Sequence, residues 1–259
     1  VSGLVVTVGG IGGLSGTFPL AFALESLPWP QVFGGVAVVA AVLALLIRQV
    51  VPEEAAPEPG QAGEGGFRTL LQNGDFRLIL VMSAVTYAPI VTVAGLWGGP
   101  YLQDVAGLSA TASGAVLMLF YLATLCAGTV FALLDRYARS RRRVILCAAG
   151  ASVASLWGLA ALPEPPIAVA IGLLVLMVVS QQFYIGLGAH MRQVVPLSML
   201  GRASSLVVLV GVAGIPAMQT GFGAVLDGAA ALGWDGADQY RLAFAAMGLA
   251  IFLATAVYR

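Results

Sequence analysis

The sequence contains little charge. Charged residues account for 9% of its 259 residues and hydrophobic residues for 59%, with a mean hydropathy of +0.96. A soluble domain carries roughly 25% charged residues, so this chain has too few to cover its surface in water. Lysine is absent, and twelve arginines balance twelve acidic residues. This composition argues against nucleic acid as a partner and indicates a lipid bilayer as the surrounding medium.

Cysteine and histidine are also scarce. Cys126 and Cys147 lie within apolar runs and lack a C-x-x-C spacing, so we expect neither a disulfide nor a metal site. The single histidine, His190, excludes a cluster of several histidines around a metal. The sequence therefore predicts no cofactor.

Long apolar runs are what the sequence has in abundance. A helix needs about 20 apolar residues to cross a hydrocarbon core of ~30 Å. Such runs predict an all-α membrane protein with eight transmembrane helices, at residues 3–24, 32–51, 77–96, 110–134, 144–162, 167–191, 203–226 and 241–258.

A polar stretch divides these spans two against six. Residues 52–76 are rich in proline, glycine and glutamate in their first half, which is typical of a flexible linker. Within it, Phe67 to Gln72 predicts either a short interfacial helix or more linker. We expect three parts: residues 1–51, the linker 52–76 on the cytoplasmic side, and a six-helix bundle at 77–259.

The segment Phe131 to Val144 sets the orientation. It holds five arginines between two apolar runs, and basic loops remain on the cytoplasmic side. With this loop inside, eleven of the twelve arginines are cytoplasmic and only Arg241 lies outside. The sequence therefore predicts a multi-pass protein of the cytoplasmic membrane, with both ends of the chain in the cytoplasm. It also predicts outer loops, one of them from Trp97 to Ser109.

Polar side chains are distributed unevenly among the spans. The second, fifth and eighth spans are almost wholly apolar, which predicts peripheral helices. The others carry polar groups near mid-span, and such groups face protein or a water-filled cavity because they are costly in hydrocarbon. The candidates for a substrate path are Tyr87, Gln181, Gln182, Tyr184, Tyr121 and Gln219. An interhelical hydrogen bond is the alternative role for each.

This three-helix rhythm suggests a repeat architecture around a central path. Pro19, Pro89 and Pro216 are expected to interrupt their helices. The first span also has G-x-x-x-G spacings, which allow close backbone approach.

Several motifs of the sequence match a known pattern. Asp135-Arg136-x-x-Arg139, followed by Arg141 to Arg143, resembles the D-R-x-G-R core of a cytoplasmic loop motif, in its second copy, of the major facilitator superfamily of secondary transporters. The passages 97–109 and 195–203 and the glycine-rich first span resemble other family segments. Phe131 and Ala138 stand where the loop motif has glycine, and Thr17 departs from the antiporter motif.

The resemblance implies a fold of two six-helix halves that work by alternating access. The chain would hold helices five to twelve, and the missing first four would be its intramolecular partner. The resemblance also implies a small-molecule substrate and a gating role for Asp135, Arg136 and Arg139, as a latch at the cytoplasmic face. Anchoring of the topology is the alternative role for these charges. Residue 1 is Val, which fits a fragment.

The coupling mode stays open at this point. No Asp, Glu or Arg lies near the middle of a predicted span, so a coupling proton would use a group in the missing helices, or transport is facilitated. A truncated, non-transporting or receptor-like relative is one alternative. An intramembrane enzyme with Ser113 and His190 is another, but ~25 Å of helix separates the two residues. For His190 we expect a helix-end cap.

Overall fold

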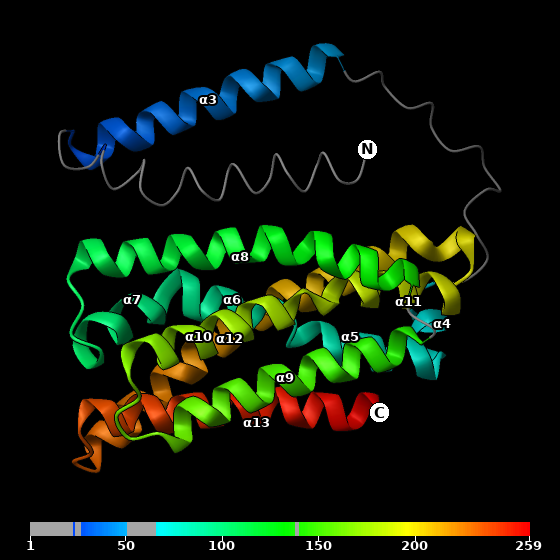
Figure 1. Cartoon of the computed structure of the whole chain (residues 1–259). Coiled ribbons are helices and arrows are strands. Elements are labelled where there is room, and N and C mark those ends of the chain that lie inside the picture. Colours follow the sequence, from blue (N-terminus) through cyan, green and yellow to red (C-terminus); the bar gives the residue numbers. More distant parts are fainter. Residues whose placement is uncertain (1–22, 24–26, 51–65, 138–139) are drawn as a thin grey trace. The chain divides into compact units, whose positions relative to one another are not determined.

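A computed structural model describes residues 23, 27–50, 66–137 and 140–259, without the side chains of Ala132, Asp135 and Arg136 (Figure 1). The regular structure of these residues is helical, and none of them forms a strand. The chain divides into two compact units, residues 1–63 and 64–259. Each is treated below by itself.

The first unit contributes one long described helix, α3 (Trp29–Val50). Its first turn includes Pro30, where the missing amide donor costs nothing because the first helical amides have no partner. Arg48 lies in its last turn, where a cation is favoured by the helix dipole. The predicted first span, with its glycines and Pro19, lies outside the described residues.

The second unit is a bundle that the chain crosses six times (Figure 1). The first crossing is a series of short helices after α4 (Phe67–Gln72), namely α5 (Gly74–Ala84), α6 (Ala88–Thr92), π-helical η1 (Val93–Trp97), α7 (Gly98–Pro100) and π-helical η2 (Tyr101–Val105). The second and third are α8 (Ala110–Tyr137) and α9 (Arg141–Ala161).

Two short helical pieces make the fourth crossing, and single helices make the last two. The fourth contains α10 (Ile167–Ser180), the 3₁₀ turn η3 (Gln181–Phe183) and α11 (Tyr184–Val194). After the 3₁₀ turn η4 (Leu197–Met199) come α12 (Leu200–Ala231) and α13 (Gly236–Tyr258). Seven of the eight predicted spans are thus present, and all seven are long and apolar enough to cross a membrane.

The predicted outer loop from Trp97 to Ser109 is wrong for most of its length. Residues 97–105 continue the first crossing as α7 and η2, although Gly98, Gly99 and Pro100 are weak helix formers. The wide π-helical turn η1 explains how the helix passes them. An added Cβ at Gly98 would lie 2.3 Å from the Val93 carbonyl oxygen, so only glycine fits this turn.

The arginine loop is also shorter than predicted. Arg141, Arg142 and Arg143 form the first turn of α9, because Ser140 caps that helix. The Ser140 hydroxyl oxygen accepts a hydrogen bond from the Arg143 amide at 3.4 Å. A serine in this position satisfies one of the amides that a helix start leaves unpaired.

The predicted interruption at Pro216 is wrong as well, since α12 continues through this proline as one helix. The predicted helix at Phe67 to Gln72 is present as α4.

Close backbone approach joins the helices of the bundle. An added Cβ at Gly214 of α12 would lie 2.1 Å from the Ala84 carbonyl oxygen at the end of α5. Gly248 of α13 likewise lies against the Trp157 indole of α9, whose Nε1 donates to the Ala245 carbonyl at 3.3 Å. The almost wholly apolar helices α9 and α13 therefore pack on each other.

Two of the helices that carry polar mid-span residues, α8 and α12, are less buried than the apolar helix α9. In α8 and α12, only 17% and 11% of the most apolar window is buried, against 44% in α9. Both helices thus leave broad faces uncovered by the second unit itself.

Candidate functional site

The first crossing breaks at Val85–Tyr87, between α5 and α6. Near this break, side-chain hydroxyls donate hydrogen bonds to backbone carbonyls. The Ser83 hydroxyl donates to the Ile79 carbonyl at 2.7 Å, and the Thr86 hydroxyl donates to the Ser83 carbonyl at 3.1 Å. Pro89 occupies the first turn of α6, where it needs no amide partner. The predicted interruption of this span is therefore present just before its proline.

The fourth crossing breaks at η3, where the helix tightens to a 3₁₀ turn without proline or glycine. Gln181 and Gln182 form this turn and are 0% and 2% exposed. Both amide atoms of Gln181 and the Nε2 atom of Gln182 have no hydrogen-bond partner among the described residues. Buried amide groups are normally paired, so these atoms call for an explanation.

Three tyrosines lie near these breaks and remain accessible. Tyr87, at the first break, is 47% exposed, and Tyr184, which directly follows η3, is 38% exposed. Tyr121 of α8 is half-buried. The hydroxyls of Tyr121 and Tyr184 both lie within electrostatic range of the Tyr87 hydroxyl. The structure therefore brings three of the six predicted path residues together from three crossings.

Gln219 has a different environment. Its Nε2 donates to the Val91 carbonyl of α6 at 3.3 Å, and its own backbone carbonyl accepts from Trp97 Nε1 at 3.1 Å. The Trp97 ring also stacks on Phe222, with centroids 5.7 Å apart. Gln219 thus connects α12 to the first crossing by two hydrogen bonds.

A second polar cluster lies at the end of the bundle where α9 begins and α13 ends (Figure 1). Arg142 Nη2 donates to the backbone carbonyls of Tyr258 at 2.7 Å and Arg259 at 2.6 Å. The Tyr258 hydroxyl lies 2.8 Å from His190 Nδ1, so the single histidine pairs with a side chain of α13. Asn73 Nδ2 donates to the Val194 carbonyl at 3.0 Å and joins the start of α5 to the end of α11.

The sequence analysis did not predict this network of hydrogen bonds. An arginine in the first turn of one helix and a tyrosine at the last residue of another carry no spacing signal that pairs them.

The proposed latch residues can be placed only in part. Asp135 and Arg136 lie in the last turn of α8, and their side chains are not described. Arg139 lies outside the described residues.

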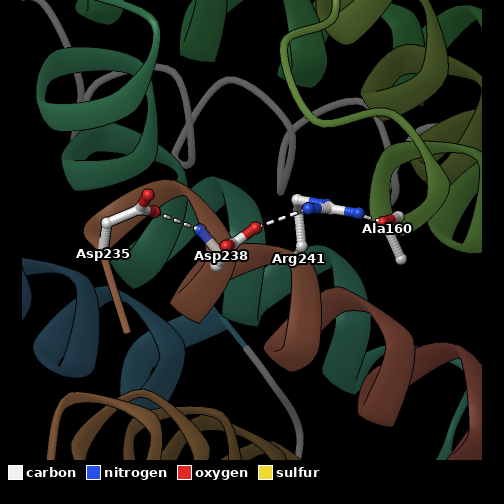
Figure 2. Close-up of polar contacts among 4 residues, drawn as sticks. All are labelled: Ala160, Asp235, Asp238 and Arg241. Carbon is white, nitrogen blue, oxygen red and sulfur yellow. Dashed lines mark hydrogen bonds and ion pairs between the residues drawn. The ribbon is translucent and has the colours of Figure 1, made fainter. Parts of the chain in front are cut away.

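At the opposite end of the bundle, Figure 2 shows a small cluster around Arg241. The Arg241 guanidinium pairs with the Asp238 carboxylate and donates from Nε to the Ala160 carbonyl of α9 at 2.9 Å. An Asp235 carboxylate oxygen accepts from the Asp238 amide at 2.9 Å and caps α13. Together with Trp234, these residues line an open depression of about 660 Å³.

Comparison with models of protein families identifies the family of this chain. The model of the Major Facilitator Superfamily matches residues 1–219, which is most of the chain. The chain belongs to the Major Facilitator Superfamily. Among curated proteins, none matches the chain.

Superfamily membership and the apolar helices establish the class of protein. Members are transporters rather than enzymes, and the chain is a multi-pass membrane protein that has the lipid bilayer as its surroundings and a small molecule as its substrate. Ser113 lies in the first turns of α8, at the end of the bundle opposite the pair of His190 and Tyr258. The structure therefore does not bring the serine and the histidine together.

Proposed function

We propose that this chain is the greater part of a secondary active transporter that moves a small solute across the cytoplasmic membrane by alternating access. In this proposal residues 1–51 are helices five and six, residues 52–76 are the central linker, and residues 77–259 are helices seven to twelve. The match to the superfamily and the six crossings of the second unit support this arrangement.

The observation that carries the proposal is the coincidence of two helix breaks with polar side chains. Transporters commonly form their substrate sites where membrane helices are discontinuous, since unwound backbone and polar side chains can then face the solute. Here α5 and α6 separate at Thr86 and Tyr87, and α10 and α11 separate at Gln181 and Gln182. Both breaks lie well inside their membrane-spanning segments.

Different roles follow for the six path residues. We assign contact with the solute to the hydroxyls of Tyr87, Tyr121 and Tyr184, which are accessible. Gln181 and Gln182 lie buried in η3, where both amide atoms of Gln181 and Nε2 of Gln182 have no partner among the described residues. We assign these amides as positioning groups that a shift of α11 would expose. Gln219 holds α12 to α6.

The uncovered faces of α8 and α12 support the two-half arrangement, because a cavity between halves needs a surface that one half leaves open. For Asp135, Arg136 and Arg139 we keep the role of a charge-assisted latch at the arginine-bearing end. Asp135→Asn in the complete gene product is then expected to reduce uptake without reducing insertion into the membrane. Unchanged uptake would contradict the latch.

The test of the function is uptake of a solute panel into vesicles that contain the complete gene product. The panel includes sugars, amino acids, organic anions and cationic drugs. The solute that accumulates is then measured with Tyr87→Phe and Tyr184→Phe, and each variant is expected to lower uptake at least about fivefold if its hydroxyl donates one hydrogen bond to the solute.

Tyr137→Phe serves as the control, because Tyr137 is 74% exposed at the far end of α8. A panel without any accumulated solute, or equal losses in all three variants, would count against the proposed function.

A further inference from the structure

A second concave surface lies on the side of the bundle formed by α5, α12 and α13. It is a shallow, open groove of about 540 Å³. Its lining consists only of aliphatic side chains, namely Leu80, Val81, Ala84, Val85, Val210, Ala250, Leu253, Ala254 and Val257. Such a lining offers no hydrogen bond to a polar solute, so it fits a hydrocarbon chain.

An arginine lies at one end of this groove. Arg77 precedes Val81 by four residues and Ala84 by seven, which places it on the same face of α5 as these groove residues. Arg77 is exposed, and its guanidinium has no hydrogen-bond or ion-pair partner among the described residues. Arg259, at the end of α13 and two residues beyond Val257, is exposed at the same end.

The other charges at this end do not cancel these two arginines. Asp75 is two residues from Arg77, which puts it on nearly the opposite side of α5, within electrostatic range of His190 and Tyr258. The mouth of the groove is therefore cationic, whereas its floor is aliphatic.

The length of the groove along α5 fits an acyl chain from one leaflet of the bilayer. From Arg77 to Val85 the helix rises ~12 Å at 1.5 Å per residue, which is somewhat less than half of a ~30 Å hydrocarbon core. A phosphate held at Arg77 would thus let an acyl chain follow the groove toward mid-bilayer, up to the break in α5.

We propose that this groove binds an anionic phospholipid of the leaflet on the arginine-bearing side, with its phosphate at Arg77 and one acyl chain along α5, α12 and α13. The occupied groove would hold α5 against α12 just below the break at Tyr87. The lipid would thereby act on the crossing that carries a proposed solute contact, Tyr87, although its binding does not depend on that function.

Competition between an anionic and a zwitterionic phospholipid tests whether the groove recognises the net negative charge of the headgroup. The full chain is purified in detergent with equimolar phosphatidylglycerol and phosphatidylethanolamine, and the retained lipids are counted by native mass spectrometry. The unmodified chain is expected to prefer phosphatidylglycerol, and Arg77→Gln to lower that preference about fivefold, as one arginine near an anionic headgroup contributes.

Arg68→Gln is the matched control, because Arg68 is exposed like Arg77 but lies in α4, outside the helices that form the groove. If both variants lose the preference for phosphatidylglycerol equally, the preference depends on the overall positive charge of the protein and not on a site at Arg77. That result would overturn the proposal.

A second pair of variants tests the acyl chain. Ala250→Phe fills the groove and is expected to lower retention of both lipids, whereas Ala256→Phe adds the same ring to an exposed position of α13 outside the lining. Unchanged retention in Ala250→Phe would contradict the proposal.

The alternative to a lipid in this groove is a segment of protein. If Val81→Cys, with Cys126 and Cys147 replaced by alanine, forms a crosslink to a cysteine placed in α3, protein fills the groove and the lipid proposal fails.

Discussion

At the scale of single residues, the glycines of α12 differ in what surrounds them. Gly214 touches the carbonyl of Ala84, but nothing lies within 4 Å of a Cβ added at Gly221 on the same helix. The sequence shows both as glycines in one apolar run and cannot tell them apart, because the distinction depends on where α5 ends. Only the packed structure identifies the position that requires glycine.

We expect Gly214→Ala to lower the free energy of unfolding by about 1–3 kcal/mol, the typical cost of overpacking. The added methyl group would force α5 and α12 apart at the break in the first crossing. Gly221→Ala should be neutral or stabilising by up to about 1 kcal/mol, since alanine favours the helix. Unfolding of the purified chain in detergent measures both, and equal stability of the two variants would refute the close approach.

For Gln181 in η3, we expect that a substitution does not lower the stability of the protein. Gln181→Leu removes two buried polar atoms that have no partner among the described residues, so it should leave the thermal midpoint unchanged or raise it. Gln219→Leu removes a hydrogen bond to Val91 and should destabilise by about 1 kcal/mol. A loss of stability in Gln181→Leu as large as in Gln219→Leu would mean that Gln181 has a structural partner.

At the scale of elements, the sequence predicted where most helices lie but not how they are built. Apolar length defined the spans, since it reflects the thickness of the bilayer. The breaks follow from other causes. The break before Pro89 was predicted from its proline, whereas the 3₁₀ turn at Gln181 has no residue that enforces it. It depends on packing against α8 and α9, which a linear pattern cannot show.

Helix starts depend on local capping side chains, and α13 provides a test of one such cap. Asp235→Ala removes the side-chain cap on the Asp238 amide and should cost about 1 kcal/mol of stability. Asp235→Asn keeps an accepting oxygen and is expected to match the unmodified chain. Thermal unfolding of both variants decides the matter, and similar losses would point to the charge of Asp235 rather than to its cap.

At the scale of the whole molecule, superfamily membership could be predicted from the sequence, because the loop motif and the span pattern resemble those of the family whose model matches residues 1–219. The path residues were harder to predict. Polarity alone selected all six, but it could not separate the exposed tyrosines from the buried glutamines or from Gln219, which bonds to its neighbours. Burial depends on the relative rotation of helices, and the sequence fixes that only through many small contacts.

The arginine distribution predicts how the molecule sits in the membrane. In a background without Cys126 and Cys147, Ser198→Cys should react with an impermeant maleimide from the cytoplasmic side, and Ser109→Cys from the outer side. Both positions are exposed and lie between crossings at opposite ends of the bundle. Labelling of the two from the same compartment would contradict the proposed orientation.

The indole of Trp97 offers a built-in optical reporter. Its nitrogen is held by the carbonyl of Gln219 and its ring stacks on Phe222, so its emission depends on how α12 sits against the first crossing. With Trp29, Trp157 and Trp234 replaced by phenylalanine, the remaining fluorophore would register movement of α12 without any attached dye. Ligands could then be screened by fluorescence before anyone knows which solute the protein carries.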